Sequence, residues 1–302
     1  MKDSQRGWLS AFDALTPEMR ASISGAWGED VGSGDVTSAA CVPAEAAESA
    51  GFLMKADGVL AGMAVAEGVF AYGAPEVRFE ALARDGDRVT RGQVIAMVDG
   101  PARQILTAER LALNYMQRMS GIATGTRRVV DLLAGTGTRV LDTRKTTPGI
   151  RVFEKAAVLM GGGMNHRMGL FDQILIKDNH VDYAGSMSAA LTQARAYLKR
   201  ENRAVPVVVE VRNLGEVAAA LEAGHVDRLL LDNFSPELAA QAVDMVAGRV
   251  LTEASGGLNP DNVRAYADAG VDFVSLGWLT HSPVPLDISL KSAVALKSMG
   301  YG

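Results

Sequence analysis

Residues 140–180 decide how the rest of the chain is interpreted, and they read VLDTRKTTPGIRVFEKAAVLMGGGMNHRMGLFDQILIKDNH. A short apolar run, Val140-Leu141, ends in a cluster of charged residues, and a second apolar run at 174–176 ends in another. A segment of helical length separates the two runs. Strands that end in charge and are joined by such a segment predict a β-α-β unit whose carboxyl-terminal ends carry a functional site.

Four cationic side chains fall at one end of this predicted unit: Arg144, Lys145, Arg167 and Lys177. Cations brought together in a cleft repel one another unless an anion binds between them. The whole chain carries a net charge of −5, which argues against a general nucleic-acid surface. The contrast between the local cations and the acidic background favours a small anionic ligand.

Length and composition restrict the class of protein. With 302 residues, the chain is long enough for one large domain or two moderate ones. Cys41 is the only cysteine, so no internal disulfide can form, and we expect a reducing, cytoplasmic location. The first residues lack the apolar core of a signal peptide, and no apolar run approaches the ~20 residues that span a bilayer, so we expect no membrane association.

The N-terminal part predicts a small α+β sandwich domain over residues 1–117. Its pattern indicates a helix over 9–26, a glycine-rich loop over 29–40 and strands with turns over 49–100, interrupted by a helix at 65–72. A long amphipathic helix is expected to begin with Thr107 as its N-cap and to break at Gly121. A C-terminal helix over 287–302 is expected to pack back on this domain.

One stretch of this domain, GDRVTRGQVIAMVDG at 86–100, is also similar to half of a biotinyl or lipoyl carrier hairpin. Such a carrier presents its modified lysine at a tight turn after this stretch. Here Pro101, Ala102, Arg103 and Gln104 follow, with no lysine. A plain strand–turn–strand is therefore the favoured interpretation.

Residues 118–286 alternate between strand and helix patterns. The predicted strands are short, apolar and β-branched, as strands buried on both faces are, and they cover 138–143, 172–177, 206–211, 228–232, 250–254 and 271–276. The predicted helices between and after them cover 149–160, 186–202, 213–223, 236–247 and 260–269. Nearly every strand ends in a polar group, which favours a (β/α) barrel over an open sheet, in which only the switch point carries a site. With about six strands, this phosphate-binding barrel is predicted to be incomplete.

The ends of the later strands supply carboxylates and glycine turns. Glu210 and Asp232 follow neighbouring strands and suit a Mg²⁺ ion held partly by water and phosphate oxygens, although ion pairs with nearby cations are an alternative. The turns at 255–258 and 276–278 would expose backbone N–H groups in the last two loops of the barrel, the usual phosphate seat. His166 could be a core histidine, but its neighbours Asn165 and Arg167 favour a role in the site.

These residues resemble those of the quinolinate phosphoribosyltransferase family, also called nicotinate-nucleotide pyrophosphorylase (carboxylating). The matching motifs appear in family order over most of residues 29–290, as GSGDVTS, ERLALNYMQRMSGIAT, LDTRKTTPGIR, GGGMNHRMGLFDQILIKDNH, VEVRN, LLLDNFS, EASGGL and VSLGWLTHS. Trp278 departs from the pattern, because a small residue is expected after the glycine, and it would narrow the phosphate turn.

The resemblance implies a pentosyltransferase that joins quinolinate to phosphoribosyl pyrophosphate with Mg²⁺, releasing pyrophosphate and CO₂ and yielding nicotinate mononucleotide for NAD biosynthesis. It implies a homodimer with shared active sites and leaves a higher oligomer open. The catalytic residues implied are Lys145, Lys177, Glu210 and Asp232, of which Glu210 and Asp232 also face the metal. The substrate-binding residues implied are Arg144, His166, Arg167 and Lys177 for quinolinate, with Arg110 from the neighbouring subunit, and Ser255, Gly256, Gly277 and His281 for phosphate.

Three other functions stay open at this point. The first is a molybdate-associated relative with the same fold, for which the KDNH motif is less typical. The second is a barrel lyase or isomerase in which Lys177 forms a Schiff base. The third is a non-catalytic anion-binding protein, which would leave the carboxylates beside the cations unexplained.

Overall fold

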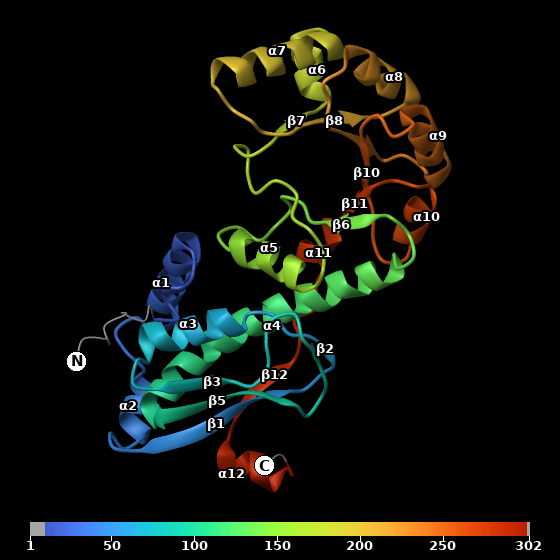
Figure 1. The fold of residues 1–302 in the computed structure, drawn as a ribbon. Helices are drawn as coiled ribbons and strands as arrows, with labels where there is room; N and C mark the ends of the chain where they lie inside the picture. The colour runs from blue at the N-terminus through green and yellow to red at the C-terminus, as the bar shows by residue number, and fades with distance from the viewer. Residues whose placement is uncertain (1–9, 301–302) are drawn as a thin grey trace, which may run out of the picture. The chain divides into compact units, whose positions relative to one another are not determined.

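The computed structural model describes residues 10–300, which form two compact units (Figure 1). Of the described residues, the first unit comprises 10–125, 147–162 and 283–300, and the second comprises 126–146 and 163–282. No helix within 10–300 is long and apolar enough to cross a membrane.

An antiparallel sheet of four strands, in the order β12-β1-β5-β3, forms the centre of the first unit. Its strands are β1 (Ala47–Met54), β3 (Arg78–Ala81), β5 (Val94–Pro101) and β12 (Ile288–Ser292), and a small second sheet pairs β2 (Gly58–Val59) with β4 (Arg88–Val89). Phe52 of β1 and Phe70 of α3 (Met63–Gly73) are fully buried and meet edge to face, with ring centroids 6.2 Å apart. The predicted α+β character of this region is therefore confirmed.

The C-terminal segment packs in the first unit, but the prediction of one helix over 287–302 is wrong. Residues 288–292 form β12, which pairs antiparallel with β1, and only α12 (Ala293–Ser298) is helical. Ile288 is buried and its strand supplies backbone hydrogen bonds to the free edge of β1. Pairing with that edge outweighs the helical propensity of so short a segment.

The N-terminal helix also differs from the prediction. A helix is expected over 9–26, but α1 covers Pro17–Val31. It begins at Pro17 because the Thr16 side chain accepts a hydrogen bond from the Met19 N–H and proline suits the first turn. Leu9, the first residue of the predicted helix, lies outside the described residues. The expected loop at 29–40 instead contains the end of α1 and α2 (Val36–Cys41), whose N-cap is Asp35.

The long helix α4 (Ala102–Leu132) begins earlier than predicted and does not break at Gly121. Thr107 lies within the helix, where its hydroxyl donates to the Arg103 carbonyl oxygen. A Cβ atom added at Gly121 would lie 2.3 Å from the Val284 carbonyl oxygen. Glycine is required there because another backbone passes close to the helix, and not as a helix breaker.

Six parallel strands form the second unit, in the order β6-β11-β10-β9-β8-β7. They are β6 (Arg139–Leu141), β7 (Ile174–Ile176), β8 (Val207–Val211), β9 (Arg228–Asp232), β10 (Leu251–Ser255) and β11 (Phe273–Ser275). Within the described residues, the end strands β6 and β7 each pair with one other strand of this sheet, so the predicted incomplete barrel of six strands is confirmed.

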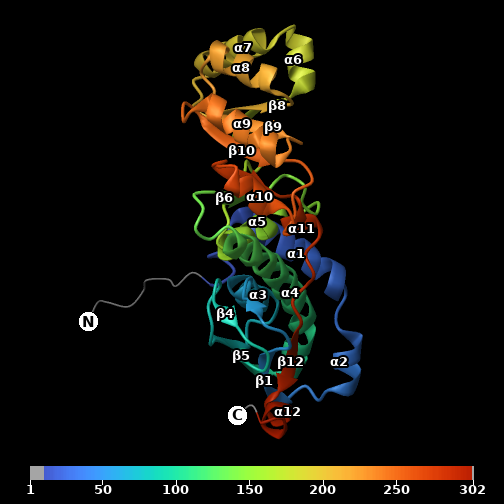
Figure 2. The same cartoon turned by 90° about the vertical axis from the view of Figure 1, so that its right-hand side faces the viewer.

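Helices lie along the outer side of this curved sheet (Figures 1 and 2). They are α7 (Met187–Arg200), α8 (Leu214–Ala223), α9 (Pro236–Val246) and α10 (Val263–Asp268), and each corresponds to a predicted helix with shifted ends. The predicted helix at 149–160 is α5 (Arg151–Met160), which belongs to the first unit. Two short helices, α6 (Asp178–Ala184) and α11 (Trp278–His281), were not predicted, because each is too short to give a periodic pattern.

Candidate active site

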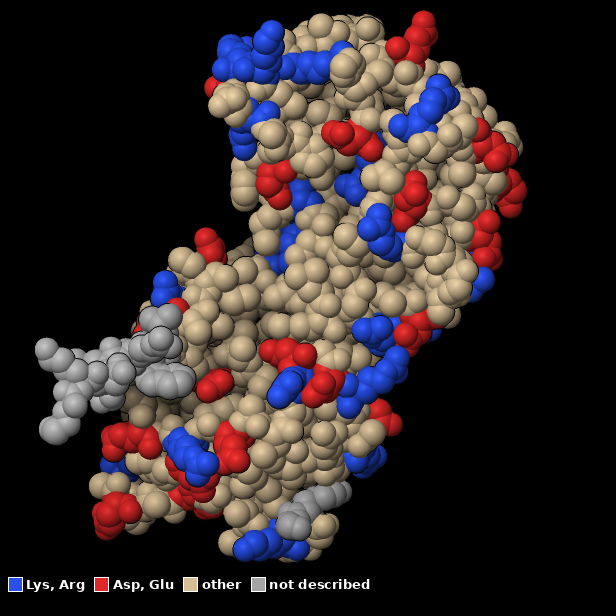
Figure 3. Space-filling view, viewed as in Figure 1, with Lys and Arg blue, Asp and Glu red and all other residues tan. Residues whose placement is uncertain are grey.

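A cavity of about 580 Å³ opens at the carboxyl-terminal ends of the six strands. It contains every predicted site residue except Arg110, namely Arg144, Lys145, His166, Arg167, Lys177, Glu210, Asp232, Ser255, Gly256, Gly277 and His281. Parallel strands bring these residues together because their carboxyl ends share one edge of the sheet. Figure 3 shows lysine and arginine side chains gathered in the hollow of this unit.

Arg110 lies on α4 in the first unit and is exposed. The cavity of the second unit is lined by residues of that unit alone. Arg110 is not among the residues that line this cavity.

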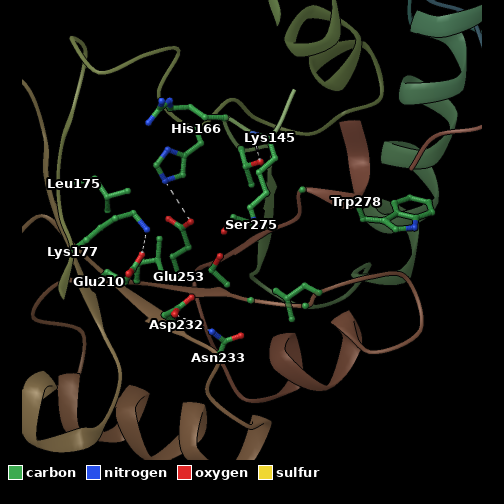
Figure 4. Close-up of a pocket in the computed structure, with 18 of the residues that line it drawn as sticks. Lys145, His166, Leu175, Lys177, Glu210, Asp232, Asn233, Glu253, Ser275 and Trp278 are labelled. Atoms are coloured by element: carbon green, nitrogen blue, oxygen red, sulfur yellow. Dashed lines mark hydrogen bonds and ion pairs between the residues drawn. The ribbon is translucent and has the colours of Figure 1, made fainter. Parts of the chain in front are cut away.

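The ion pair between Lys177 and Glu210 joins two neighbouring strand ends (Figure 4). Lys177 Nζ lies 2.5 Å from Glu210 Oε2, and β7 and β8 are adjacent in the sheet. Ion pairing with a nearby cation, the alternative to metal binding given in the sequence analysis, is therefore observed for Glu210. The Lys177 amine is engaged with a carboxylate, so this contact gives no support to the Schiff-base alternative.

Asp232 has a different partner. Asn233 Nδ2 donates to Asp232 Oδ2 at 2.9 Å, and the Asn233 main-chain N–H donates to the Ser255 carbonyl oxygen at 2.9 Å. Asn233 takes a positive φ of 56°, which asparagine tolerates better than most residues. Asp232 is thus held by an amide, so its negative charge is not offset by that contact.

The cationic side of the cavity is formed by the segments that follow β6 and precede β7. Arg144 and Lys145 follow β6, and Arg167 precedes β7. Burial, and secondly the positive charge of Arg144, lower the pKa of Arg167 below its usual value. Two guanidinium groups that repel each other in this way favour an anion between them.

Two glycine turns face the cavity at the ends of β10 and β11. Gly256 and Gly257 have φ values of 100° and 62°, and a Cβ atom at Gly277 would lie 3.0 Å from Lys145 Cδ and 3.1 Å from His281 Cδ2. The Thr280 hydroxyl donates to the Lys145 carbonyl oxygen at 2.7 Å, which joins the last turn to the first. Trp278 also lines the cavity, but Figure 4 shows its indole ring apart from the labelled carboxylates.

The residues that could hold a metal are few. Over residues 10–300, no group of three or more His, Cys, Asp or Glu side chains is arranged to hold a metal ion. Glu210 and Asp232 offer carboxylate oxygens on adjacent strands, β8 and β9. Such a pair fits Mg²⁺ only if water and substrate oxygens complete the coordination, which is how Mg²⁺ commonly binds.

Glu253 and Asn233 are polar lining residues that were not among the predicted site residues. Glu253 is fully buried beside His166, whose Nε2 lies 3.5 Å from Glu253 Oε1 (Figure 4). Both residues lie in or directly after predicted strands, where the sequence signals a polar group without revealing its partner. The LDN sequence at the end of β9 was the available signal for Asn233, because asparagine is favoured where the backbone requires a positive φ.

Comparison with known proteins agrees with this arrangement. Residues 35–120 match the family described as quinolinate phosphoribosyl transferase, N-terminal domain, and residues 122–291 match the corresponding C-terminal domain. A quinolinate phosphoribosyltransferase [decarboxylating] 1b from Nicotiana tabacum is 43% identical over 291 residues, which cover 91% of this chain and 83% of the tobacco protein. A probable nicotinate-nucleotide pyrophosphorylase [carboxylating] from Bacillus subtilis is 39% identical over 90% of this chain and 92% of its own length. The crystal structure of NadC from Streptococcus pyogenes superposes with a TM-score of 0.87 at 41% identity and covers 92% of this chain and 97% of that one.

Proposed function

The chain belongs to the quinolinate phosphoribosyltransferase family, and from that premise we propose how its cavity carries out the family's reaction. The enzyme transfers a phosphoribosyl group from phosphoribosyl pyrophosphate to quinolinate with decarboxylation, giving nicotinate mononucleotide, CO₂ and pyrophosphate in NAD biosynthesis. The assignment of this cavity depends on one observation: four lysine and arginine side chains and three carboxylates meet at the carboxyl ends of one parallel sheet.

Quinolinate takes the side of the cavity formed by Arg144, His166 and Arg167. Quinolinate carries two carboxylates, and a guanidinium group can bind a carboxylate with two parallel hydrogen bonds. The lowered pKa of Arg167 beside Arg144 supports this placement, because a bound dianion would relieve the repulsion between them. The phosphate groups of the co-substrate take the opposite side, where Lys145, His281 and the glycine turns provide cations and backbone N–H groups.

The chemical step requires stabilisation of positive charge on the ribose as pyrophosphate leaves. Asp232 and Glu210 provide negative charge beside the ribose, and Lys145 and Lys177 bind the anionic leaving group. The pyridine nitrogen attacks the anomeric carbon, and the resulting pyridinium accepts the electrons released when the neighbouring carboxylate leaves as CO₂. No covalent bond to the protein forms.

A Mg²⁺ ion is part of this proposal. Glu210 and Asp232 would hold it together with water and phosphate oxygens, and when bound it would neutralise charge on the departing pyrophosphate. The test is whether the purified protein releases CO₂ from quinolinate only when phosphoribosyl pyrophosphate and Mg²⁺ are both present. CO₂ release that persists without phosphoribosyl pyrophosphate would refute the coupling of decarboxylation to transfer.

The site is completed by a second subunit in a homodimer. Arg110 is exposed on α4, so its side chain is accessible to a second subunit. Arg110 would bring a further cation to quinolinate. The interface would be isologous, so that each dimer has two identical sites.

Complementation tests the shared site. Arg110→Ala and Lys177→Ala proteins, each inactive alone, are mixed and allowed to exchange subunits. In the heterodimer both lesions fall in one site and leave the other intact, so activity is expected to return to about half that of wild type per heterodimer. If subunits exchange and no activity returns, Arg110 does not act across the dimer.

A cytoplasmic location completes the proposal, supported by the single cysteine. The relative from Arabidopsis thaliana is chloroplastic, so the location of the family is not uniform. Fractionation of the cells that produce the protein would test this assignment.

A further inference from the structure

Glu253 is a buried carboxylate that the reaction described above does not use. It lies on β10 within the barrel, and its side chain has no exposed surface. Burial raises the pKa of Glu253, and the positive charge of Arg228 opposes that rise. A carboxylate removed from water destabilises the fold unless cations or donors compensate it, so its presence in the barrel calls for a functional or structural reason.

Two side chains that can carry a positive charge lie beside Glu253, one at each carboxylate oxygen. Arg228 Nε lies 2.9 Å from Oε2, and the Arg228 side chain is only 13% exposed. Arg228 in turn stacks over the Phe273 ring, 5.1 Å from its centroid. On the other side, His166 Nε2 lies 3.5 Å from Oε1. Neither approach has hydrogen-bond geometry, so both oxygens are buried acceptors that can bond to either neighbour after a small adjustment.

The His166 ring is restricted at both nitrogens. Its Nδ1 accepts a hydrogen bond from the Arg167 main-chain N–H at 2.7 Å. In the neutral ring the proton must therefore be on Nε2, which is the atom that faces Glu253. The His166 main-chain N–H donates to Asp142 Oδ1 at 2.8 Å, and Asp142 is also fully buried.

The segment that carries His166 and Arg167 has little regular structure to hold it. Met164 bridges to Leu141 of β6, and residues 165–173 then cross to β7 without forming a helix or strand. The direction of the two quinolinate-binding side chains thus depends on individual side-chain anchors, and Glu253 is an anchor that lies beside the His166 ring.

We propose that Glu253, held by Arg228, is a positioning residue for quinolinate: it fixes the His166 ring and, through the Arg167 N–H bonded to that ring, directs Arg167 into the cavity. This inference rests on the proposed placement of quinolinate beside His166 and Arg167. A carboxylate suits the task because its two oxygens lie beside Arg228 and His166 at once. A glutamine has one acceptor oxygen and leaves one of these donors unpaired.

Steady-state kinetics of Glu253→Gln provide the first test. His166 and Arg167 bind quinolinate in the ground state and in the transition state, so their misplacement raises KM for quinolinate more than it lowers kcat. We expect KM for quinolinate to rise about tenfold or more, as for the loss of a hydrogen bond to a charged group, with KM for phosphoribosyl pyrophosphate unchanged. The matched control is Asp272→Asn, which disturbs the bonds between that side chain and Thr252, the residue before Glu253 on β10, and leaves the Glu253 carboxylate itself in place. It should lower stability without changing KM for quinolinate.

Nitrogen NMR of the histidine rings gives a second, structural readout. The chain has four histidines, so the His166 signals can be assigned by their loss in His166→Gln. In the wild type we expect the neutral Nε2–H form, and in Glu253→Gln we expect shifted or exchange-broadened His166 signals with the other three unchanged. A double variant, Glu253→Gln with Arg228→Gln, leaves no unpaired buried ion and keeps the test valid if the single variant does not fold.

The possible results separate the inference from the proposed function. A wild-type protein without quinolinate-dependent CO₂ release would overturn the function itself. An active wild type whose folded Glu253→Gln or double variant keeps KM for quinolinate within about twofold, with unchanged His166 signals, would overturn the positioning role.

Discussion

Gly256 offers the sharpest test of how the phosphate turn and the carboxylate Asp232 are connected. A Cβ atom at Gly256 would lie 2.3 Å from Asn233 Oδ1 and 2.9 Å from the Asn233 backbone nitrogen, and the residue has a φ of 100°. The backbone nitrogen cannot move aside without breaking its hydrogen bond to the Ser255 carbonyl oxygen. Alanine at this position is therefore expected to displace Asn233 and the Asp232 carboxylate bonded to it.

The neighbouring Gly257 supplies a matched control. Its φ is 62° and nothing lies within 4 Å of an added Cβ atom. Gly257→Ala should cost about 1–2 kcal/mol of the free energy of unfolding through its left-handed backbone alone. Gly256→Ala adds overpacking of about 1–3 kcal/mol, so a total of about 2–5 kcal/mol is expected. The entropy that alanine removes from the unfolded chain is the same in both variants and cancels in the comparison.

Denaturant unfolding and CO₂ release measure the two effects. We expect kcat/KM for phosphoribosyl pyrophosphate to fall about tenfold or more in Gly256→Ala, because the Asn233 bond that orients Asp232 is lost. The fall should be much smaller in Gly257→Ala. Equal stability and equal activity in the two variants would refute the proposed connection between the turn and Asp232.

Three further predictions concern single positions. Arg144→Lys keeps the charge but loses the two-pronged hydrogen bonding, so calorimetry should show quinolinate binding weakened about tenfold or more; unchanged binding would remove Arg144 from the site. Asp232→Asn should lower Mg²⁺-dependent turnover far more than it weakens quinolinate binding, whereas a purely structural Asp232 would alter thermal stability and leave both little changed. Gly121→Ala should lower the free energy of unfolding by about 1–3 kcal/mol, because the added Cβ atom would press on the Val284 carbonyl oxygen. Gly25 lies in a helix with open space around it, so Gly25→Ala should raise the free energy of unfolding by up to about 1 kcal/mol. A change of the same sign in both variants would contradict the packing role of Gly121.

The barrel strands could be predicted because each is a short β-branched run that ends in a polar residue. The predicted range 228–232 coincides with β9, and the other strands differ only at their ends. The continuity of α4 through Gly121 could not be predicted, because the reason for the glycine is a backbone more than a hundred and fifty residues later in the chain. The strand β12 was missed for a similar reason, since its partner β1 lies near the other end of the sequence.

The site residues, too, could be predicted only in part. Strand ends indicated which residues share the cavity, because topology alone brings them together. The partners of each charge could not be read from the sequence. Glu253 lies in a strand whose faces are both buried, so alternation does not reveal that its side chain faces the interior, His166 and Arg228.

These partners distinguish the three carboxylates of the cavity. Glu253 is compensated by Arg228 within the barrel, and the charge of Glu210 is offset by Lys177 at 2.5 Å. Asp232 is held by an amide, which orients the carboxylate and leaves its charge intact. Phosphate oxygens would compete with Glu210 for Lys177, so we infer that the negative charge of Glu210 becomes fully available only when the co-substrate binds. Asp232 therefore faces the cavity with its charge uncompensated before any substrate arrives, and this is why its neutralisation in Asp232→Asn is expected to act mainly on the charged chemical step.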